Sequence, residues 1–220
     1  MSRPIVVGID YGHGGLIDGR YQNAGKQYTF TDHGDHWIGE GLINRRIAAK
    51  VIGLLLRDTD AIVVDCVAGL CWESGPHWYD LDQRDASLRE RVKNANAQTL
   101  DIFVSLHSNA IGDEIRGPSR RPRGVSFFTS PGQTVADDYA TAFYRAFEAQ
   151  DLPIRPGHWG DADQDWEAPF YVLTKTRAPA VLAEVGFYTN IEDARYLQSE
   201  AGQDEIARCY VAGILACVGQ

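Results

Sequence analysis

Apolar residues along this chain fall into short continuous runs, separated by longer stretches in which apolar residues recur at helical spacing. Continuous apolar runs are typical of strands in a sheet that is covered on both faces. They predict strands at residues 5–9, 61–67, 102–106, 125–129, 171–173 and 180–183.

Helices are predicted between these strands. One covers residues 40–57, with Ile43, Ile47, Val51 and Leu55 on one face. A second begins at Ser87, where Glu90 gives a capping-box spacing, and its apolar face is expected to carry Leu88, Val92 and Ala95. The others cover residues 134–150 and the C-terminal segment that carries Ile206, Tyr210, Ile214 and Leu215.

Strands that alternate with helices predict an α/β fold. We expect a single three-layer domain over residues 1–220, with a central, mostly parallel or mixed twisted sheet of about six strands and helices on both faces. No internal repeat, low-complexity linker or second domain is visible in the sequence.

Two histidines stand where apolar runs end. His13 follows the run 4–9 within a glycine-rich turn, and His107 follows the run 102–106. In α/β folds, ligands and chemistry gather at the edge of the sheet where strands end. Either histidine alone is more often a hydrogen-bonded structural residue than a metal ligand, so the pair is only a starting point for a zinc site.

Two carboxylates extend this pattern. Glu40 opens the first predicted helix, where its ordinary role is to offset the helix dipole, but it is also the best third ligand for a catalytic zinc, which needs three protein ligands and an open position. Glu184 ends the apolar run 180–183, and a charge there is costly unless it is paired or functional. Four further histidines, at positions 33, 36, 77 and 158, keep an alternative ligand open, and His36, which is close to Glu40 in sequence, is the most plausible of them.

These residues belong to a longer series of motifs in which the chain resembles the zinc-dependent N-acetylmuramoyl-L-alanine amidases, the α/β catalytic-domain type of bacterial cell-wall hydrolases and phage endolysins. The matching motifs occur in the family's order. They are Ile9-Asp10-Tyr11-Gly12-His13-Gly14-Gly15, Glu40 with Asn44, Ser87-Leu88-Arg89-Glu90-Arg91 with Ala95-Asn96, Ser105-Leu106-His107-Ser108-Asn109-Ala110, Tyr171-Val172-Leu173, and the run from Pro179 to Asn190.

The resemblance implies Zn²⁺ as cofactor, with His13, Glu40 and His107 as its ligands and Glu184 as the catalytic carboxylate. It implies hydrolysis of the amide bond between N-acetylmuramic acid and L-alanine in peptidoglycan. Asn109 is a candidate for binding the substrate oxyanion, although its amide could instead cap its own loop. Two alternatives stay open: another zinc peptidase acting on wall peptides, and a non-catalytic peptidoglycan-binding module.

The charge narrows the choice of partners. With 21 Lys and Arg against 30 Asp and Glu, the net charge is −9, which argues against nucleic acid as a partner. A basic segment at residues 116–123 is expected to be a solvated loop.

No apolar run is long enough for a membrane span, and the N-terminal residues do not resemble a secretory signal. We expect a monomer, made in the cytoplasm, that acts on the cell wall, as a phage endolysin does.

Three segments, at residues 16–39, 68–84 and 152–168, are predicted to be loops over the site. Trp72, Trp78 and Trp159 lie in the second and third of them, and each is expected either to contact substrate or to pack beneath its own loop. Of the four cysteines, Cys209 and Cys217 are predicted to be core thiols, while a disulfide between Cys66 and Cys71 is left undecided by the sequence.

Overall fold

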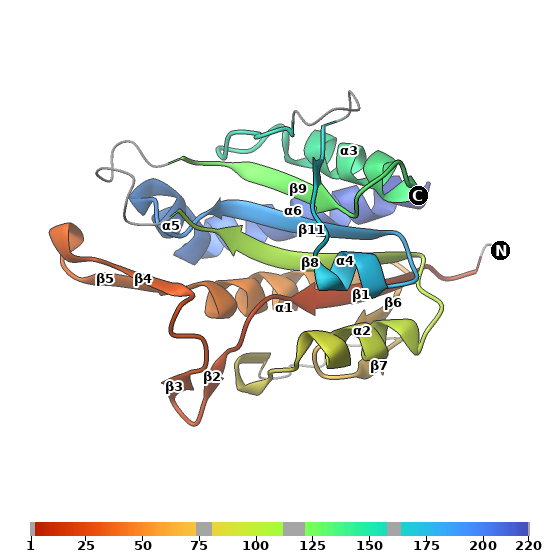
Figure 1. Cartoon of the computed structure of the whole chain (residues 1–220), viewed down its shortest axis with the longest axis horizontal. Coiled ribbons are helices and arrows are strands. Elements are labelled where there is room, and N and C mark those ends of the chain that lie inside the picture. Colours follow the sequence, from red (N-terminus) through yellow and green to blue (C-terminus); the bar gives the residue numbers. More distant parts are fainter. Residues whose placement is uncertain (1–2, 74–80, 112–121, 158–163, 220) are drawn as a thin grey trace.

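The centre of the protein is a seven-stranded sheet in the order β10-β9-β11-β8-β1-β6-β7 (Figure 1). The computed structural model describes residues 3–73, 81–111, 122–157 and 164–219. The strands are β1 (Val6–Tyr11), β6 (Ile62–Asp65), β7 (Leu70–Trp72), β8 (Ile102–Asn109), β9 (Val125–Thr129), β10 (Trp166–Glu167) and β11 (Ala180–Phe187). The sheet is mixed, because β9 runs antiparallel to β11 and β7 antiparallel to β6, while the other neighbours are parallel.

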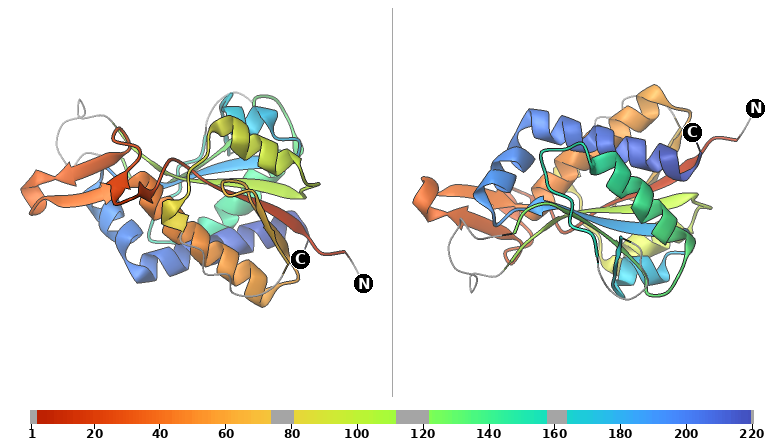
Figure 2. Two further views of the ribbon diagram at one scale, coloured as in Figure 1. Left: turned by 90° about the horizontal axis from the view of Figure 1, so that it is seen from below. Right: turned by 90° about the horizontal axis from the view of Figure 1, so that it is seen from above.

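Helices cover both faces of this sheet (Figure 2). One face carries α1 (Glu40–Asp58), α3 (Val135–Phe147) and α6 (Glu200–Cys217), and the other carries α2 (Leu88–Asn96) and α4 (Tyr171–Lys175). A further helix, α5 (Ile191–Gln198), packs against β11 and α6. The three-layer α/β architecture predicted from the sequence is therefore confirmed.

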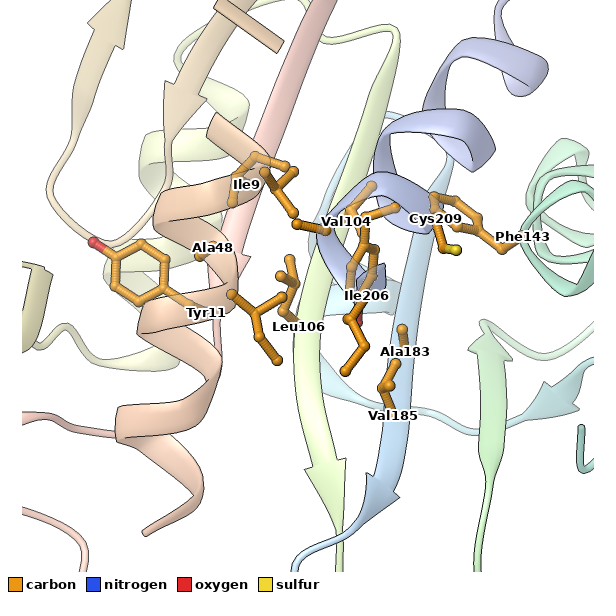
Figure 3. Close-up of a cluster of buried hydrophobic side chains, with 14 of the residues drawn as sticks. Ile9, Tyr11, Ala48, Val104, Leu106, Phe143, Ala183, Val185, Ile206 and Cys209 are labelled. Carbon is orange, nitrogen blue, oxygen red and sulfur yellow. The ribbon is translucent and has the colours of Figure 1, made fainter. Parts of the chain in front are cut away.

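The larger hydrophobic core lies between the sheet and α1, α3 and α6 (Figure 3). Successive strand residues point to opposite faces, and alternate positions of the three central strands enter this core: Val7, Ile9 and Tyr11 of β1, Ile102, Val104 and Leu106 of β8, and Val181, Ala183 and Val185 of β11. The intervening positions face α2 and α4, where Phe103 and Leu182 belong to a second, smaller core. The same alternation places Asp10, Ser105, His107 and Glu184 on that second face, toward the ends of their strands.

Two helices begin at capping boxes, of which the sequence predicted the one at the start of α2. Ser87 and Glu90 form a complete capping box at the start of α2, and Thr134 and Asp137 form one at the start of α3. Leu88, however, is exposed, and Arg91 takes the inward position beside Val92 and Ala95. The prediction for the apolar face of α2 was therefore wrong at Leu88.

The predicted strand at residues 171–173 is also wrong, because Tyr171–Lys175 forms the helix α4. Three apolar residues are too few to distinguish periods of 2 and 3.6. Here Thr174 donates a hydrogen bond from its backbone N–H to the Phe170 carbonyl, and a helical turn results.

The segment at 16–39 is not a plain loop, because it forms two small sheets. The first pairs β2 (Leu16–Ile17) with β3 (Arg20–Tyr21), and the second pairs β4 (Gln27–Phe30) with β5 (His36–Gly39). The β4–β5 hairpin projects from the body of the molecule at the end near the start of α1 (Figures 1 and 2).

All four cysteines are free thiols: Cys66, Cys71, Cys209 and Cys217. Cys209 is buried, as predicted.

No helix in the described part of the chain is both long and apolar enough to cross a membrane.

Trp72 lies in β7 and packs into the larger core with 5% of its surface exposed. Of the two roles considered for it, packing is the one the structure supports; Trp78 and Trp159 lie outside the described residues. Trp72→Ala is expected to lower the free energy of unfolding by about 3–5 kcal/mol, as for other buried aromatic truncations. Urea unfolding measures this. The control is Leu88→Ala, at an exposed position, where a change within about 0.5 kcal/mol is expected; equal effects of the two variants would contradict the packing role.

Candidate active site

His13, Glu40 and His107 meet at the edge of the sheet where β1 and β8 end. Glu40 Oε1 lies 3.1 Å from His13 Nε2 and 3.1 Å from His107 Nδ1. The potential ligand atoms of the three residues all lie within 4.8 Å of one another, and this is the one cluster of three or more such groups found among the described residues. His13 lies 27 positions before Glu40 in the sequence, and His107 lies 67 positions after it. The fold brings the three residues together, as the sequence predicts.

The turn that carries His13 depends on glycine and on an unusual backbone conformation. His13 has a φ of 66°, in the left-handed region, which costs a residue with a side chain of order 1 kcal/mol or more. A Cβ at Gly12 would lie 2.0 Å from the His107 ring, so only glycine lets the two imidazoles approach. The Gly12 N–H donates to the Leu106 carbonyl at 2.9 Å, which fixes the turn to β8.

Glu40 is the first residue of α1 and is almost fully buried. Burial alone would raise the pKa of its carboxyl, but hydrogen bonds with His107 and His13 outweigh it and lower that pKa to about 2. The carboxylate is therefore ionised beside two imidazoles. Its second oxygen, Oε2, is buried with no hydrogen-bond partner in the described structure, and the Lys26 ammonium lies 3.6 Å away.

The three donor groups suit a catalytic zinc ion. Two imidazole nitrogens and one carboxylate oxygen form a known ligand set for hydrolytic zinc. Burial lowers the pKa of His13, with Glu40 opposing the shift, and a lowered pKa favours the neutral imidazole that a metal requires. Burial also lowers the pKa of His107, but Glu40, Glu184 and Asp10 outweigh it and raise that pKa, so a metal ion would have to displace the proton of this imidazole. The buried Glu40 carboxylate has one ion-pair partner, the partly exposed Lys26, and its Oε2 atom makes no hydrogen bond among the described residues; a metal ion would neutralise it further, so these residues fit the group.

Glu184 lies on β11 in register with His107 on the neighbouring strand β8. Burial raises the pKa of Glu184 to about 7; the His107 charge lowers it and the Glu40 charge raises it. Its Oε2 atom is buried without a hydrogen-bond partner among the described residues. This carboxyl is therefore poised between its charged and neutral forms near neutral pH, as a general base requires.

The remaining site predictions have different outcomes. Asn109 ends β8, and its side-chain oxygen accepts a hydrogen bond from the Ala110 N–H at 2.8 Å, which is the local capping role. His36 lies on β5 against Phe30 and is not part of the His13–Glu40–His107 cluster. His77, His158 and most of the basic segment lie outside the described residues; Arg123, at its end, pairs with Glu192 and Asp193.

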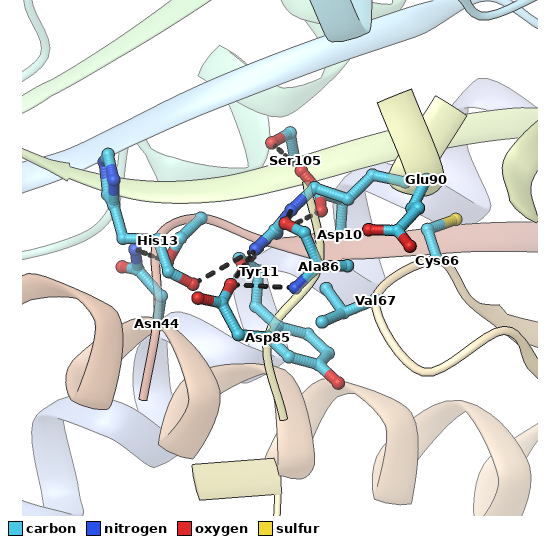
Figure 4. A network of polar contacts seen from close by, with 12 residues as sticks. Asp10, Tyr11, His13, Asn44, Cys66, Val67, Asp85, Ala86, Glu90 and Ser105 are labelled. Atoms are coloured by element: carbon cyan, nitrogen blue, oxygen red, sulfur yellow. Dashed lines mark hydrogen bonds and ion pairs between the residues drawn. The ribbon is translucent and has the colours of Figure 1, made fainter. Parts of the chain in front are cut away.

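A buried polar network beneath the site was not predicted. Arg91 of α2 donates to Asp10 Oδ1 at 2.7 Å, and the Ser105 hydroxyl donates to Asp10 Oδ2 at 2.6 Å (Figure 4). Asn44 links the two histidine loops, since its side chain donates to the Gly12 carbonyl and accepts from Ser108. Asp10 was a sequence signal for this network because it is a carboxylate that interrupts an apolar strand; Asn44, Arg91 and Ser105 lie in the motifs of the resemblance, which did not indicate that they contact one another.

Asp10→Asn is expected to lower the free energy of unfolding by about 3–5 kcal/mol at neutral pH, because it removes the buried carboxylate partner of Arg91 and leaves only the partly exposed Asp85 beside this charge. Burial raises the pKa of Asp10, but the Arg91 guanidinium and the Ser105 hydroxyl outweigh it and hold this pKa below its usual value. The stabilisation is thus present above the ordinary aspartate pKa of about 3.9 and is lost as the pH falls through the lower pKa of the folded protein.

Chemical denaturation of both proteins at pH 7 and at successively lower pH checks this prediction. The gap between wild type and variant should be full at pH 7 and should narrow below about pH 4. A gap that stays constant, or one below 1 kcal/mol at pH 7, would contradict the assigned role of the pair.

A family model described as N-acetylmuramoyl-L-alanine amidase matches residues 7–216. The match spans nearly all of the sequence, so the chain belongs to the N-acetylmuramoyl-L-alanine amidase family.

Individual proteins are similar to this chain as well. The uncharacterized protein YqiI of Bacillus subtilis (strain 168) is 30% identical over 169 residues, which are 74% of this chain and 74% of that protein. The N-acetylmuramoyl-L-alanine amidase LytC of the same organism is 28% identical over 192 residues, covering 84% of this chain but 34% of LytC. This chain therefore corresponds to about a third of LytC.

A solved structure shares the fold. The N-acetylmuramoyl-L-alanine amidase from Clostridium difficile 630 superposes with a TM-score of 0.73 over 100% of this chain and 99% of that one, at 24% sequence identity.

Proposed function

We propose that this protein is a zinc-dependent amidase that hydrolyses the bond between the lactyl group of N-acetylmuramic acid and the L-alanine of the stem peptide in peptidoglycan. The observation that carries the proposal is the convergence of His13, Glu40 and His107 beside Glu184, in a chain of the N-acetylmuramoyl-L-alanine amidase family.

His13 Nε2, Glu40 Oε1 and His107 Nδ1 would hold the zinc ion. When bound, zinc supplies a Lewis acid that polarises the scissile carbonyl and makes water a nucleophile near neutral pH. The left-handed turn at His13, the start of α1 and the end of β8 each contribute one ligand, so the geometry of the site depends on the packing of three elements.

Glu184 moves the proton. Its carboxylate accepts a proton from the attacking water and then donates it to the leaving nitrogen of L-alanine, which departs as an amine. A pKa of about 7 suits both steps, because a general base that must also act as an acid works best when its pKa is close to the operating pH. The side-chain oxygen of Asn109 accepts a hydrogen bond from the Ala110 N–H. Its side-chain N–H₂ group would donate a hydrogen bond to the oxyanion.

The setting follows from the family, whose members act on the cell wall. We propose that the whole chain works as one catalytic domain and as a monomer, with peptidoglycan as its substrate. Light scattering coupled to gel filtration tests the monomer.

Digestion of purified peptidoglycan tests the reaction class. The proposal predicts that new free amino groups appear while the number of reducing sugar ends stays constant, because an amidase cuts no glycosidic bond. An increase in reducing ends without new amino groups would overturn it.

A further inference from the structure

The backbone carbonyl of His13 is a shared acceptor for two buried arginines. Arg45 Nη2 donates to it at 2.8 Å and Arg91 Nη2 at 3.2 Å. The two guanidinium groups come from different helices, Arg45 from α1 and Arg91 from α2, and both side chains are almost completely buried. Burying two charged groups against one carbonyl is costly. The carbonyl belongs to His13, whose imidazole is a proposed metal ligand.

The hydrogen bonds of Arg45 within the described part of the chain all go to backbone carbonyls. Its guanidinium donates to the carbonyls of His13, Gly41, Leu81 and Arg84, at distances of 2.5–3.0 Å. Gly41 adjoins Glu40 in the first turn of α1, so one side chain joins the His13 turn, the start of the Glu40 helix and the 81–84 segment. The planar fork of arginine can hold several acceptors at fixed angles, which lysine cannot do.

Arg91 holds the same turn from the other side of the sheet. It donates to the carbonyls of Tyr11 at 2.7 Å and His13 at 3.2 Å, and it pairs with Asp10 and Asp85 (Figure 4). Its position is thus tied to β1, the strand that leads into the turn.

The backbone conformation of His13 explains why the turn needs this support. With a φ of 66°, His13 occupies a region that a residue with a side chain adopts only when its surroundings impose it. The direction of the carbonyl and that of the Cα–Cβ bond are fixed together by the backbone dihedrals. Holding the carbonyl therefore fixes the direction in which the His13 side chain leaves the backbone.

We propose that Arg45 and Arg91 are positioning residues that hold His13 in its left-handed conformation and thereby set the affinity of the site for zinc. This inference rests on the proposed function, because it takes His13 as a zinc ligand. The loss of a group that orients a metal ligand typically weakens metal binding 10- to 100-fold.

The test is a zinc titration of the full chain against a chromophoric chelator, with Arg45→Lys and Arg91→Lys as variants. Each keeps the charge but loses the fork, and zinc affinity should fall about 10- to 100-fold. The control is Tyr11→Phe, which removes the buried hydrogen bond to Asp65 and keeps the ring that lies 5.1 Å from the Arg45 guanidinium carbon. Its zinc affinity should equal that of wild type even where its metal-free melting temperature falls as much as in the arginine variants.

Zinc affinity that is unchanged in the lysine variants, or that falls equally in Tyr11→Phe, would overturn the inference. A lysine variant whose metal-free form has lost its circular dichroism spectrum would assign that arginine to folding and overturn the inference for that residue. Failure of the proposed function looks different: wild-type protein would bind zinc no more tightly than a His13→Ala variant.

Discussion

Replacing Glu184 with glutamine is expected to reduce turnover on peptidoglycan by about 10²- to 10⁴-fold, the usual cost of removing a general base. The amide keeps the size of the side chain but cannot accept the proton of the attacking water. Because Glu184 is not one of the three clustered ligands, zinc content should stay at that of wild type. Initial rates on purified peptidoglycan, with metal analysis of the same samples, check both statements.

The same substitution at an exposed glutamate distinguishes the loss of a general base from the loss of one negative charge. Glu148→Gln alters an exposed residue at the end of α3 and should leave the rate within a factor of two, roughly the change that small surface effects produce. If Glu184→Gln retains near-normal turnover, Glu184 is not the base; His158 and Asp161, which lie outside the described residues, would then be tested.

Removal of zinc is expected to abolish activity, and stoichiometric zinc should restore it. The reason is that His13, Glu40 and His107 would hold the metal ion that serves as Lewis acid in the proposed reaction. His107→Ala should also abolish activity, and added zinc should not restore it, since two remaining ligands do not make a catalytic zinc site. Rates measured before chelation, after it and after zinc addition provide the check.

His33→Ala is the control for this second prediction. His33 pairs with Asp32, away from the cluster of His13, Glu40 and His107, and its loss should change neither zinc content nor rate. Full activity in protein shown by elemental analysis to be metal-free would contradict the metal's role.

The sequence predicted those parts of the fold that leave a local pattern. β1, β8 and β11 were recognised because strands buried on both faces are continuous apolar runs. The start of α2 was recognised because Ser87 and Glu90 have a capping-box spacing. β7 and β10 were missed as separate strands because segments of two or three residues carry no measurable period.

The position of the site residues could be predicted for a related reason, but the contacts of the two arginines behind them could not. His13, His107 and Glu184 each lie at or near the end of an apolar run, so the sheet itself brings them to one edge. Arg45 and Arg91 bond mainly to backbone carbonyls, several of them more than 30 positions away in the chain. A backbone acceptor leaves no trace in residue type, so no pattern in the sequence pointed to these contacts.

Mass spectrometry of defined muropeptides digested by the zinc-loaded protein would show which amide bond it cleaves. For the proposed amidase we expect two products: a disaccharide whose lactyl group ends in a free carboxylate, and an intact stem peptide that begins with a free L-alanine amino group. Cleavage between two amino acids of the stem, with alanine still attached to the sugar, would identify a peptidase and rule out the proposed function.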